Sequence, residues 1–217
     1  MPGLFITFEG TEGGGKSTQI NLLAERLRQL GKTVRVLREP GGTPIGEEIR
    51  HTLKHSEHNR AMTPETELLL MNASRAQLVR EVIRPALAAG EIVLCDRFYD
   101  STVAYQGYGR GLDLAMVRGV VAVAIGETKP HLTLLLHVPV EISEARRLAR
   151  GAAQRDRFEE AERDFFARVE RGYAEIAASE PERVKVIDAT GNVSQVADAI
   201  WRCVEPVIVS ADILPAR

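Results

Sequence analysis

The strongest constraint on this chain is a glycine-rich segment that directly follows an apolar stretch near the N-terminus. Residues 4–9 (LFITFE) predict a buried β-strand, and the eight residues after it, GTEGGGKS, fit the pattern G-x-x-x-x-G-K-[ST]. An amphipathic pattern over 17–30 then predicts a helix that ends at Gly31. Glycines let the backbone curl so that successive N–H groups point at one anion, and the helix N-terminus adds positive charge. The segment therefore predicts a phosphate-binding loop rather than a glycine-rich turn with an incidental lysine.

This loop predicts a site for a nucleoside triphosphate and its Mg²⁺ cofactor. Lys16 is expected to reach the outer phosphates, and the Ser17 hydroxyl to bind the metal ion. Asp96, at the end of a later apolar stretch, is expected to hold the Mg²⁺ shell through water. The residues expected to bind the nucleoside triphosphate are Gly10, Thr11, Glu12, Gly13, Gly14, Gly15, Lys16, Ser17 and Thr18.

The rest of the chain alternates between apolar stretches and helical patterns. Further strands are expected at 33–38, 91–96, 132–138 and 184–189, most of them continuously apolar as in parallel strands covered on both faces. Thr43-Pro44 and Thr63-Pro64 each predict a helix start, and the second helix should run to about residue 89 with a kink near Pro85. Further helices are expected at 112–126, 140–150, 160–179 and 194–209. The prediction is one α/β domain, residues 1–217, with a doubly wound five-stranded parallel sheet flanked by helices.

Composition narrows the function classes. The formal net charge is -2 and aromatic residues make up 5%, which disfavours a nucleic-acid partner. The two cysteines lie far apart and show no metal-ligand spacing. No apolar run approaches the ~20 residues that span a bilayer, and no secretory signal is evident, so a cytoplasmic protein without a membrane partner is expected.

Charged residues follow two of the expected strands, where ligands gather in a parallel sheet. The second strand leads into REPGGTPIG (38–46) and the third into DRFYDSTVAYQG (96–107), and both segments are expected to be loops. Arg97 is placed to grip a phosphate group, because its planar fork matches two oxygens. The alternative for Asp96 and Arg97, and likewise for Arg38, is an ordinary surface ion pair.

An arginine interrupts an apolar helical stripe. Arg75 shares one face of the long helix with Leu68, Met71, Leu78 and Val82. A buried guanidinium is costly unless it is paired. Either an acidic neighbour pairs with Arg75, or this face lines a pocket where Arg75 contacts a polar ligand.

At this point the chain resembles a known family. The segments FEGTEGGGKST, REPGGTPIGEEIR, DRFYDSTVAYQGYGRG and RLARGAAQRDRFE occur in the order seen in bacterial-type thymidylate kinases, from about residue 3 to residue 200. The resemblance implies the P-loop fold of nucleoside monophosphate kinases and the reaction ATP + dTMP = ADP + dTDP, which supplies dTTP synthesis. It also implies a homodimer.

The resemblance implies a role for each acceptor-side residue. Arg97 and Arg38 match arginines that clamp the dTMP phosphate, Arg75 matches one that hydrogen-bonds a thymine carbonyl, and Tyr105 matches an aromatic ring that excludes a ribose 2′-hydroxyl. Glu12 matches an acidic loop residue that reaches the 3′-hydroxyl of the acceptor sugar; a solvent-facing Glu12 is the alternative. The expected dTMP-binding residues are Glu12, Arg38, Leu68, Met71, Arg75, Arg97, Ser101, Thr102, Tyr105 and Gln106. The aromatic residue with which the family often stacks on thymine has no aromatic match in this helix.

A mobile lid is expected at about residues 146–158. Some family members have an arginine beside the acidic loop residue, where this chain has Gly13, and the glycine type instead has basic residues in the lid. The basic residues here are Arg146, Arg147, Arg150, Arg155 and Arg157. We expect Arg150 and Arg155 to act in catalysis with Lys16, Arg97 and Glu12; a charged, solvated helix end is the alternative.

Two other functions stay open at this stage. A kinase for another nucleoside monophosphate shares every argument except those on Arg75, Thr102 and Tyr105. An ATP-driven switch or nucleic-acid-binding module would share only the phosphate loop, and the chain lacks the N-K-x-D segment of a GTPase.

Overall fold

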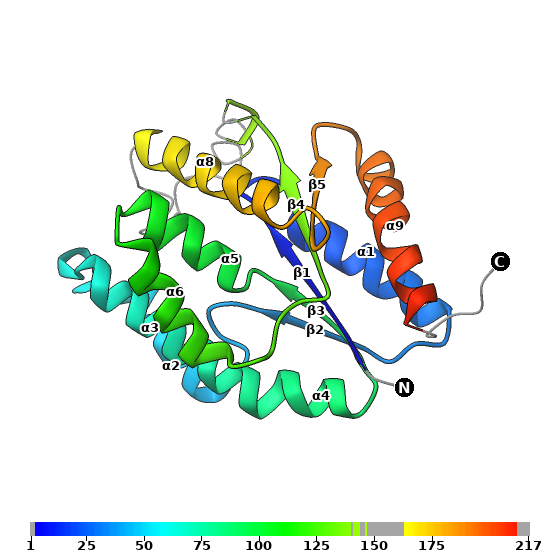
Figure 1. Cartoon of the computed structure of the whole chain (residues 1–217), viewed down its shortest axis with the longest axis horizontal. Helices are drawn as coiled ribbons and strands as arrows, with labels where there is room; N and C mark the ends of the chain where they lie inside the picture. Colours follow the sequence, from blue (N-terminus) through cyan, green and yellow to red (C-terminus); the bar gives the residue numbers. More distant parts are fainter. Residues whose placement is uncertain (1–2, 140, 144–145, 147–162, 212–217) are drawn as a thin grey trace.

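The computed structural model describes residues 3–139, 141–143, 146 and 163–211. Its centre is a five-stranded sheet in the order β2-β3-β1-β4-β5, and every neighbouring pair is parallel (Figure 1). The strands are β1 (Leu4–Glu9), β2 (Val34–Arg38), β3 (Ile92–Asp96), β4 (Leu132–His137) and β5 (Val184–Asp188). The predicted fold class is confirmed, and each strand lies within one residue of its expected bounds at either end.

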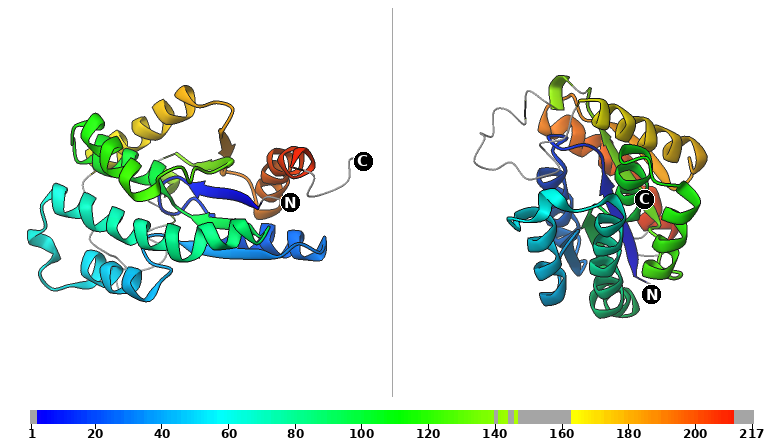
Figure 2. Two further views of the ribbon diagram at one scale, coloured as in Figure 1. Left: turned by 60° about the horizontal axis from the view of Figure 1, so that its bottom comes forward. Right: turned by 90° about the vertical axis from the view of Figure 1, so that its left-hand side faces the viewer.

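Helices lie on both faces of the sheet (Figure 2). They are α1 (Lys16–Gln29), α2 (Pro44–His55), α3 (Pro64–Leu78), α4 (Arg84–Ala88), α5 (Tyr99–Thr102), α6 (Leu114–Ile125), α8 (Arg163–Ser179) and α9 (Val193–Ser210). A short 3₁₀ turn, η1 (Asn59–Ala61), precedes α3, and two π-helical segments, η2 (Val79–Ile83) and η3 (Val103–Gly109), continue α3 and α5.

The alternation of side chains along β1 divides the core between the two faces. Leu4, Ile6 and Phe8 pack with α1 and α9 in one buried cluster. Phe5 points the other way and packs with the α3–α4 region and α6. Glu9 has the same parity as Phe5, so it points to the face that α5 and α8 cover.

The long helix predicted from residue 63 to about 89 changes geometry just before Pro85, close to the expected kink. Thr63 accepts from the Thr66 N–H as a cap, as predicted from sequence. The change in helix geometry is the π turn η2, which ends two residues before Pro85. Proline has no N–H to donate to the preceding turn, and prolines and π turns are both common sites of altered helix geometry.

The prediction of a loop at residues 96–107 is wrong. After Phe98 the chain forms α5 and then the π-helical η3, which runs to Gly109. The segment lies against α8 and α6, so its apolar residues Val103, Ala104 and Tyr105 are buried in the cluster that α8 completes. Sequence alone showed charged residues after a strand, whereas the helix is stabilised by packing against an element 60 residues later.

Candidate active site

The loop after β1 is shaped as a phosphate cradle. Gly10 has φ +122° and a Cβ there would lie 2.3 Å from the Leu136 carbonyl oxygen, so only glycine fits. Lys16 is folded back over the loop, where its Nζ donates to the carbonyl oxygens of Gly10 and Thr11 at 3.0 Å each. Burial, followed by the nearby Arg97 charge, lowers the pKa of Lys16 to about 8. The ammonium group is thus held beside the cradle by neutral partners that a phosphate can replace.

A cavity of about 560 Å³ opens in front of this loop. The expected ATP-binding residues that line it are Glu12, Gly13, Gly15, Lys16, Ser17 and Thr18. Gly10 and Thr11 contact Lys16 instead, as described above, and Gly14 lies under the loop near the Leu136 backbone. The volume is within the range of nucleotide-sized ligand pockets.

The two expected metal ligands lie together at the floor of this cavity. Ser17 Oγ donates to Asp96 Oδ2 at 3.2 Å. Asp96 Oδ1 is buried and has no hydrogen-bond partner among the described residues. An unpaired carboxylate oxygen beside a hydroxyl fits a hard cation that keeps most of its waters and takes its other ligands from phosphates. Within the described ranges, no group of three or more His, Cys, Asp or Glu residues forms a self-contained metal site.

Gly13 is closely covered by the segment that follows β4. Its φ is +83°, and a Cβ would lie 3.0 Å from the Ser143 carbonyl oxygen. Arg146 donates from Nη1 to the Gly13 carbonyl oxygen at 3.2 Å and to the Ala189 carbonyl oxygen at 3.3 Å. Arg147, Arg150, Arg155 and Arg157 lie outside the described residues, so the expected lid arginines stay a prediction.

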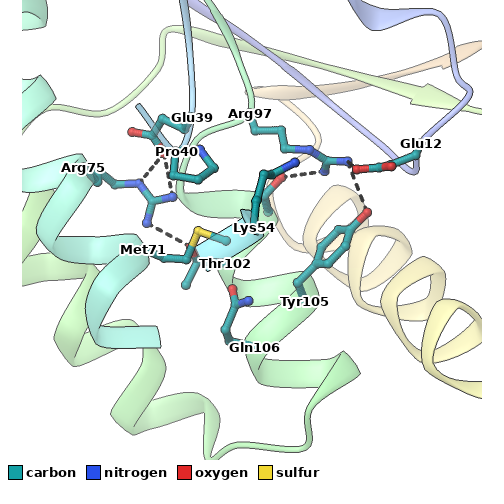
Figure 3. Close-up of a pocket in the computed structure, with 11 residues that line it drawn as sticks. Glu12, Glu39, Pro40, Lys54, Met71, Arg75, Arg97, Thr102, Tyr105 and Gln106 are labelled. Atoms are coloured by element: carbon teal, nitrogen blue, oxygen red, sulfur yellow. Dashed lines mark hydrogen bonds and ion pairs between the residues drawn. The ribbon is translucent and has the colours of Figure 1, made fainter. Parts of the chain in front are cut away.

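A second, narrower pocket of about 50 Å³ opens beside the first, between the loop after β1, helices α2 and α3, and the α5–η3 segment. Both cavities are lined by Glu12, Glu39, Lys54 and Arg97, and Figure 3 shows these four residues with the others that line the narrow pocket. The pocket is also lined by Pro40, Met71, Arg75, Ser101, Thr102, Tyr105 and Gln106. Of the expected acceptor residues, Leu68 is buried in the core and Arg38 lines only the larger cavity among these two.

Arg97 lies where the two cavities meet. It is the one non-glycine residue in the described chain with a left-handed backbone, at φ +69°, a costly conformation that directs the side chain into the site. Its Nη2 donates to Tyr105 Oη at 3.2 Å and lies 3.6 Å from Glu12 Oε1 (Figure 3). Its Nη1 donates to Ser101 Oγ and to Tyr173 Oη.

Glu9 lies behind Arg97 and is fully buried. Its Oε1 accepts from the Phe98 N–H at 2.7 Å, and its Oε2 accepts from Ser101 Oγ at 2.5 Å and from Tyr173 Oη at 3.0 Å. Burial, reinforced by the Asp100 carboxylate, raises the pKa of Glu9 to about 7. Sequence reasoning placed Glu9 at the strand end without a role and missed Tyr173, whose position on α8 gave no signal.

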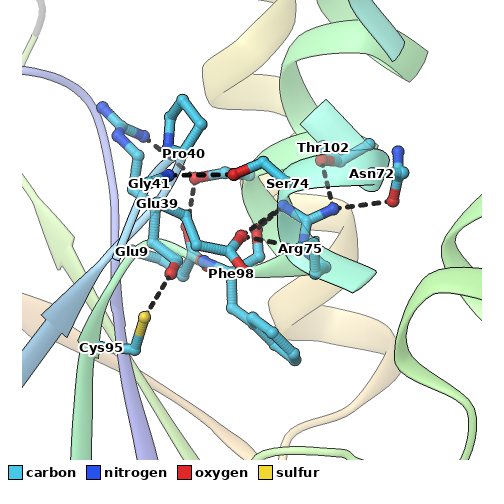
Figure 4. Close-up of polar contacts among 12 residues, drawn as sticks. Glu9, Glu39, Pro40, Gly41, Asn72, Ser74, Arg75, Cys95, Phe98 and Thr102 are labelled. Carbon is cyan, nitrogen blue, oxygen red and sulfur yellow. Dashed lines mark hydrogen bonds and ion pairs between the residues drawn. The ribbon is translucent and has the colours of Figure 1, made fainter. Parts of the chain in front are cut away.

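Arg75 is paired with an acid, as the first sequence alternative required, and it also lines a pocket; its contact with a ligand stays a prediction. It is paired with Glu39 through Nε at 2.8 Å and Nη2 at 2.6 Å, and it also lines the narrow pocket (Figure 4). Nη1 donates to Asn72 Oδ1 and Thr102 Oγ1, and Nη2 to the Phe98 carbonyl oxygen. Its side chain is 2% exposed. Since a guanidinium has five N–H groups, protein partners already occupy its donors in this structure.

Gln106 is held at the end of the narrow pocket by a buried acid. Its Nε2 donates to Glu67 Oε1 at 2.8 Å, and Arg110 donates to both oxygens of Glu67. The Gln106 carbonyl oxygen is therefore turned toward the other lining residues (Figure 3). Sequence reasoning included Gln106 but not Glu67. An acidic residue in the first turn of a helix is usually interpreted as a solvent-exposed side chain that interacts with the helix dipole.

Helix α2 contributes basic residues that the sequence did not single out. Arg50 donates to the Pro40 carbonyl oxygen at 2.9 Å and lines the large cavity together with Lys54. Arg38 instead pairs with Glu47 at 2.9 Å and its side chain is half-exposed. A signal was available, since Arg50 and Lys54 are four residues apart and so lie on one helix face.

Comparisons with known proteins agree with this geometry. The family model described as thymidylate kinase matches residues 8–200. The chain belongs to the thymidylate kinase family. A thymidylate kinase of Thermomicrobium roseum is 52% identical, over 94% of this chain and 95% of its own length. One from Syntrophotalea carbinolica is 50% identical, over 91% of this chain and 93% of its own.

A solved structure of the family has the same fold. The crystal structure of thymidylate kinase from Ehrlichia chaffeensis superimposes with a TM-score of 0.76 at 32% identity, and the match covers 94% of this chain and 99% of that one. Like its family, the protein is a phosphotransferase that uses ATP. No helix in the described part of the chain is long and apolar enough to cross a membrane.

Proposed function

We propose that the protein transfers the γ-phosphoryl group of ATP to the phosphate of dTMP, giving ADP and dTDP. The observation that supports this most is the shared wall of the two cavities, because Glu12 and Arg97 line both. One cavity has a triphosphate cradle, and the other is a narrow pocket with an apolar wall and a few polar groups. Two nucleotides bound in them would meet head to head at Arg97.

The chemistry asks the protein mainly to position two anions. A phosphate oxygen of dTMP is a competent nucleophile at neutral pH, so no strong general base and no covalent intermediate are needed. Lys16 and the backbone N–H groups of the cradle would bind the donor phosphates, while Arg97 binds the acceptor phosphate. Arg50 and Lys54 add positive charge to the same cavity.

Ser17 and Asp96 would hold Mg²⁺, which supplies charge neutralisation on the donor phosphates when bound. Their 3.2 Å separation and the unpaired Asp96 Oδ1 fit this role. Glu12 would accept a hydrogen bond from the 3′-hydroxyl of the acceptor sugar, as its position in the shared wall allows.

Thymine would occupy the end of the narrow pocket beyond Arg97. Met71 and Pro40 offer apolar contact there, and Arg75, Thr102 and Gln106 offer polar groups. Tyr105 lies between this end and Arg97, where its ring would meet a 2′-hydroxyl. Thymine carbonyls would exchange with one of the acceptors that Arg75 now uses.

A homodimer and a cytoplasmic location complete the proposal. Helices α3 and α6 pack side by side and expose large apolar residues, namely Leu69 (58%), Met116 (42%) and Val123 (78%). Exposed apolar side chains on two adjacent helices suit contact with a second copy. The cytoplasm is where both nucleotide substrates are expected. Sedimentation of the protein and of Val123→Glu tests the dimer, which this substitution should weaken.

The reaction is tested by measuring ADP release with ATP and, in turn, dTMP, dUMP, UMP, CMP, AMP and GMP. We expect dTMP to give the highest kcat/KM. A clear preference for another monophosphate would replace the acceptor assignment. ATP turnover that depends on nucleic acid, with no response to any monophosphate, would reject the kinase function.

A further inference from the structure

The carboxylate of Glu9 lies on the protein side of Arg97, opposite the cavities, and touches neither. It is completely buried on β1, and its hydrogen-bond partners come from the segment after β3, from α5 and from α8. A buried carboxylate needs hydrogen-bond partners. The described partners of Glu9 either follow Arg97 closely in the chain, as Phe98 and Ser101 do, or contact its side chain, as Tyr173 does. This raises the question of what Glu9 does for the acceptor site.

Two hydroxyl groups connect Glu9 to Arg97. Ser101 Oγ and Tyr173 Oη both lie within donating distance of Glu9 Oε2, at 2.5 Å and 3.0 Å, and both accept from Arg97 Nη1, at 3.0 Å and 3.2 Å. The two hydroxyl oxygens are also 2.9 Å apart, so either one can donate to the other instead. A hydroxyl has one proton to donate. When each proton points at the carboxylate, each oxygen turns its lone pairs toward the guanidinium.

This arrangement fixes which edge of Arg97 faces the ligand. Ser101 and Tyr173 occupy Nη1, and Tyr105 occupies one hydrogen of Nη2. No described residue accepts a hydrogen bond from Nε, and the nearest acid, Glu12, lies 3.6 Å from Nη2, beyond hydrogen-bond distance, so the Nε and Nη2 edge can take a ligand. That edge is the one that binds two oxygens of a phosphate in parallel.

We propose that Glu9 is a positioning residue, which orients Arg97 through the Ser101 and Tyr173 hydroxyls so that the Nε–Nη2 edge meets the acceptor phosphate. This inference rests on the proposed function. It gives Glu9 a role in binding the acceptor phosphate, although Glu9 itself lines neither cavity. The orienting form is the carboxylate. A neutral Glu9 frees the two hydroxyl protons to turn toward the guanidinium, where they face other donors.

The charge state of Glu9 depends on the groups around it. Arg97 and the hydrogen bonds from Ser101 and the Phe98 N–H favour the carboxylate, while burial and Asp100 oppose it, with a resulting pKa of about 7. The other titratable groups that interact with Glu9 are Lys16, Cys95, Tyr99, Tyr105 and Tyr173. The carboxylate therefore predominates above neutral pH and is lost as the pH falls below it.

A double-mutant cycle separates positioning from general structural support. We expect Glu9→Gln to lower kcat/KM for dTMP by about 10- to 100-fold, with KM for ATP little changed. In an Arg97→Met background the same substitution should change kcat/KM by no more than about 2-fold, because Arg97 is no longer there to orient. If turnover of Arg97→Met is too slow, the Kd for dTMP from calorimetry closes the same cycle.

Glu67→Gln is the matched control. Glu67 is equally buried and also accepts side-chain hydrogen bonds, but it acts on Gln106 at the other end of the pocket. Its effect should be the same with and without Arg97. A Glu9→Gln penalty that is likewise unchanged by Arg97→Met would overturn the proposal.

The pH profile gives a second, independent readout. The phosphate of dTMP titrates near pH 6 in every variant, so the informative quantity is the ratio of kcat/KM between wild type and Glu9→Gln. This ratio should be largest above about pH 8 and approach one below about pH 6. A ratio that does not vary with pH would contradict an orienting carboxylate.

Tyr173→Phe provides a second test in case Glu9→Gln does not fold. It removes one of the two bridging hydroxyls and keeps the aromatic ring. It should show a smaller loss that also disappears in the Arg97→Met background, and an additive loss would reject the model. Failure of the wild-type protein to phosphorylate dTMP would be seen before any variant is made. The proposed function and the role of Glu9 are thus tested separately.

Discussion

Replacing Arg75 with methionine should destabilise the protein by an amount that depends on pH. The guanidinium forms two contacts with Glu39, at 2.8 Å and 2.6 Å, and both side chains are almost completely buried. Methionine fills a similar volume but leaves the Glu39 carboxylate without its counter-ion. Removing one partner of a buried ion pair costs about 3–5 kcal/mol, because the remaining charge stays desolvated.

The electrostatic part of this loss has an upper limit. Burial already raises the pKa of Glu39, although Arg75 opposes the shift. Without Arg75 the pKa of Glu39 rises further. Glu39 then takes up a proton and avoids the cost of a buried, unpaired charge. Holding a carboxyl of unfolded pKa about 4.3 in its neutral form costs about 3.7 kcal/mol near pH 7 and about 1.6 kcal/mol near pH 5.5. Since a carboxyl with a raised folded pKa loses stability as the pH increases, the penalty should grow with pH.

The assay is thermal unfolding of wild type and Arg75→Met near pH 5.5 and near pH 7. For a chain of this size, 1 kcal/mol corresponds to about 2–4 °C in Tm, so the variant should melt about 10 °C below wild type near pH 7. Near pH 5.5 the gap should shrink by about 4–8 °C. Arg75→Met combined with Glu39→Gln should remove most of the pH dependence. A gap of the same size at both pH values would refute the reasoning.

Three further predictions concern catalysis. Burial holds the pKa of Lys16 at about 8, so kcat/KM for ATP should fall as the pH rises through 8; Lys16→Arg, which stays charged, should lack this decline even if slower overall. Tyr105→Ala should reduce the preference for dTMP over its ribonucleotide analogue by about 10-fold while Tyr105→Phe keeps it, and an unchanged preference would count against the ring as a steric barrier. Removing Mg²⁺ with EDTA should abolish turnover, and Asp96→Asn should raise the Mg²⁺ concentration needed to restore it; an unchanged requirement would exclude Asp96 as a ligand.

The parts of the fold that sequence predicted are those set by local patterns. The strand, glycine loop and helix over 4–30 are encoded by apolar runs and by a loop that needs particular residue types. Thr43 and Thr63 marked helix starts because a capping oxygen acts on N–H groups three residues away. Such signals involve neighbours in the chain, so no tertiary information was required.

Sequence reasoning was weakest where residues far apart in the chain depend on each other. The helix at 99–109 was expected to be a loop because its stabilising partner is α8. Tyr173 showed no pattern of its own, yet it contacts Glu9 at a separation of 164 residues. Arg38 was singled out because it follows a strand directly; it lines the large cavity but is paired with Glu47. Helix α2 returns along the same cavity and adds Arg50, which the sequence analysis did not single out.

These long-range contacts also explain why the acceptor side is built around buried carboxylates. Glu9, Glu39 and Glu67 each face a residue that lines the narrow pocket, namely Arg97 through two hydroxyls, Arg75 directly, and Gln106 directly. A long polar side chain loses conformational entropy when a ligand fixes it in one rotamer. A buried hydrogen-bond acceptor that fixes the side chain before the ligand binds reduces this cost of binding. Each carboxylate is costly to bury, so three such pairs around one pocket indicate that stability has been given up to preorganise the side chains that line it.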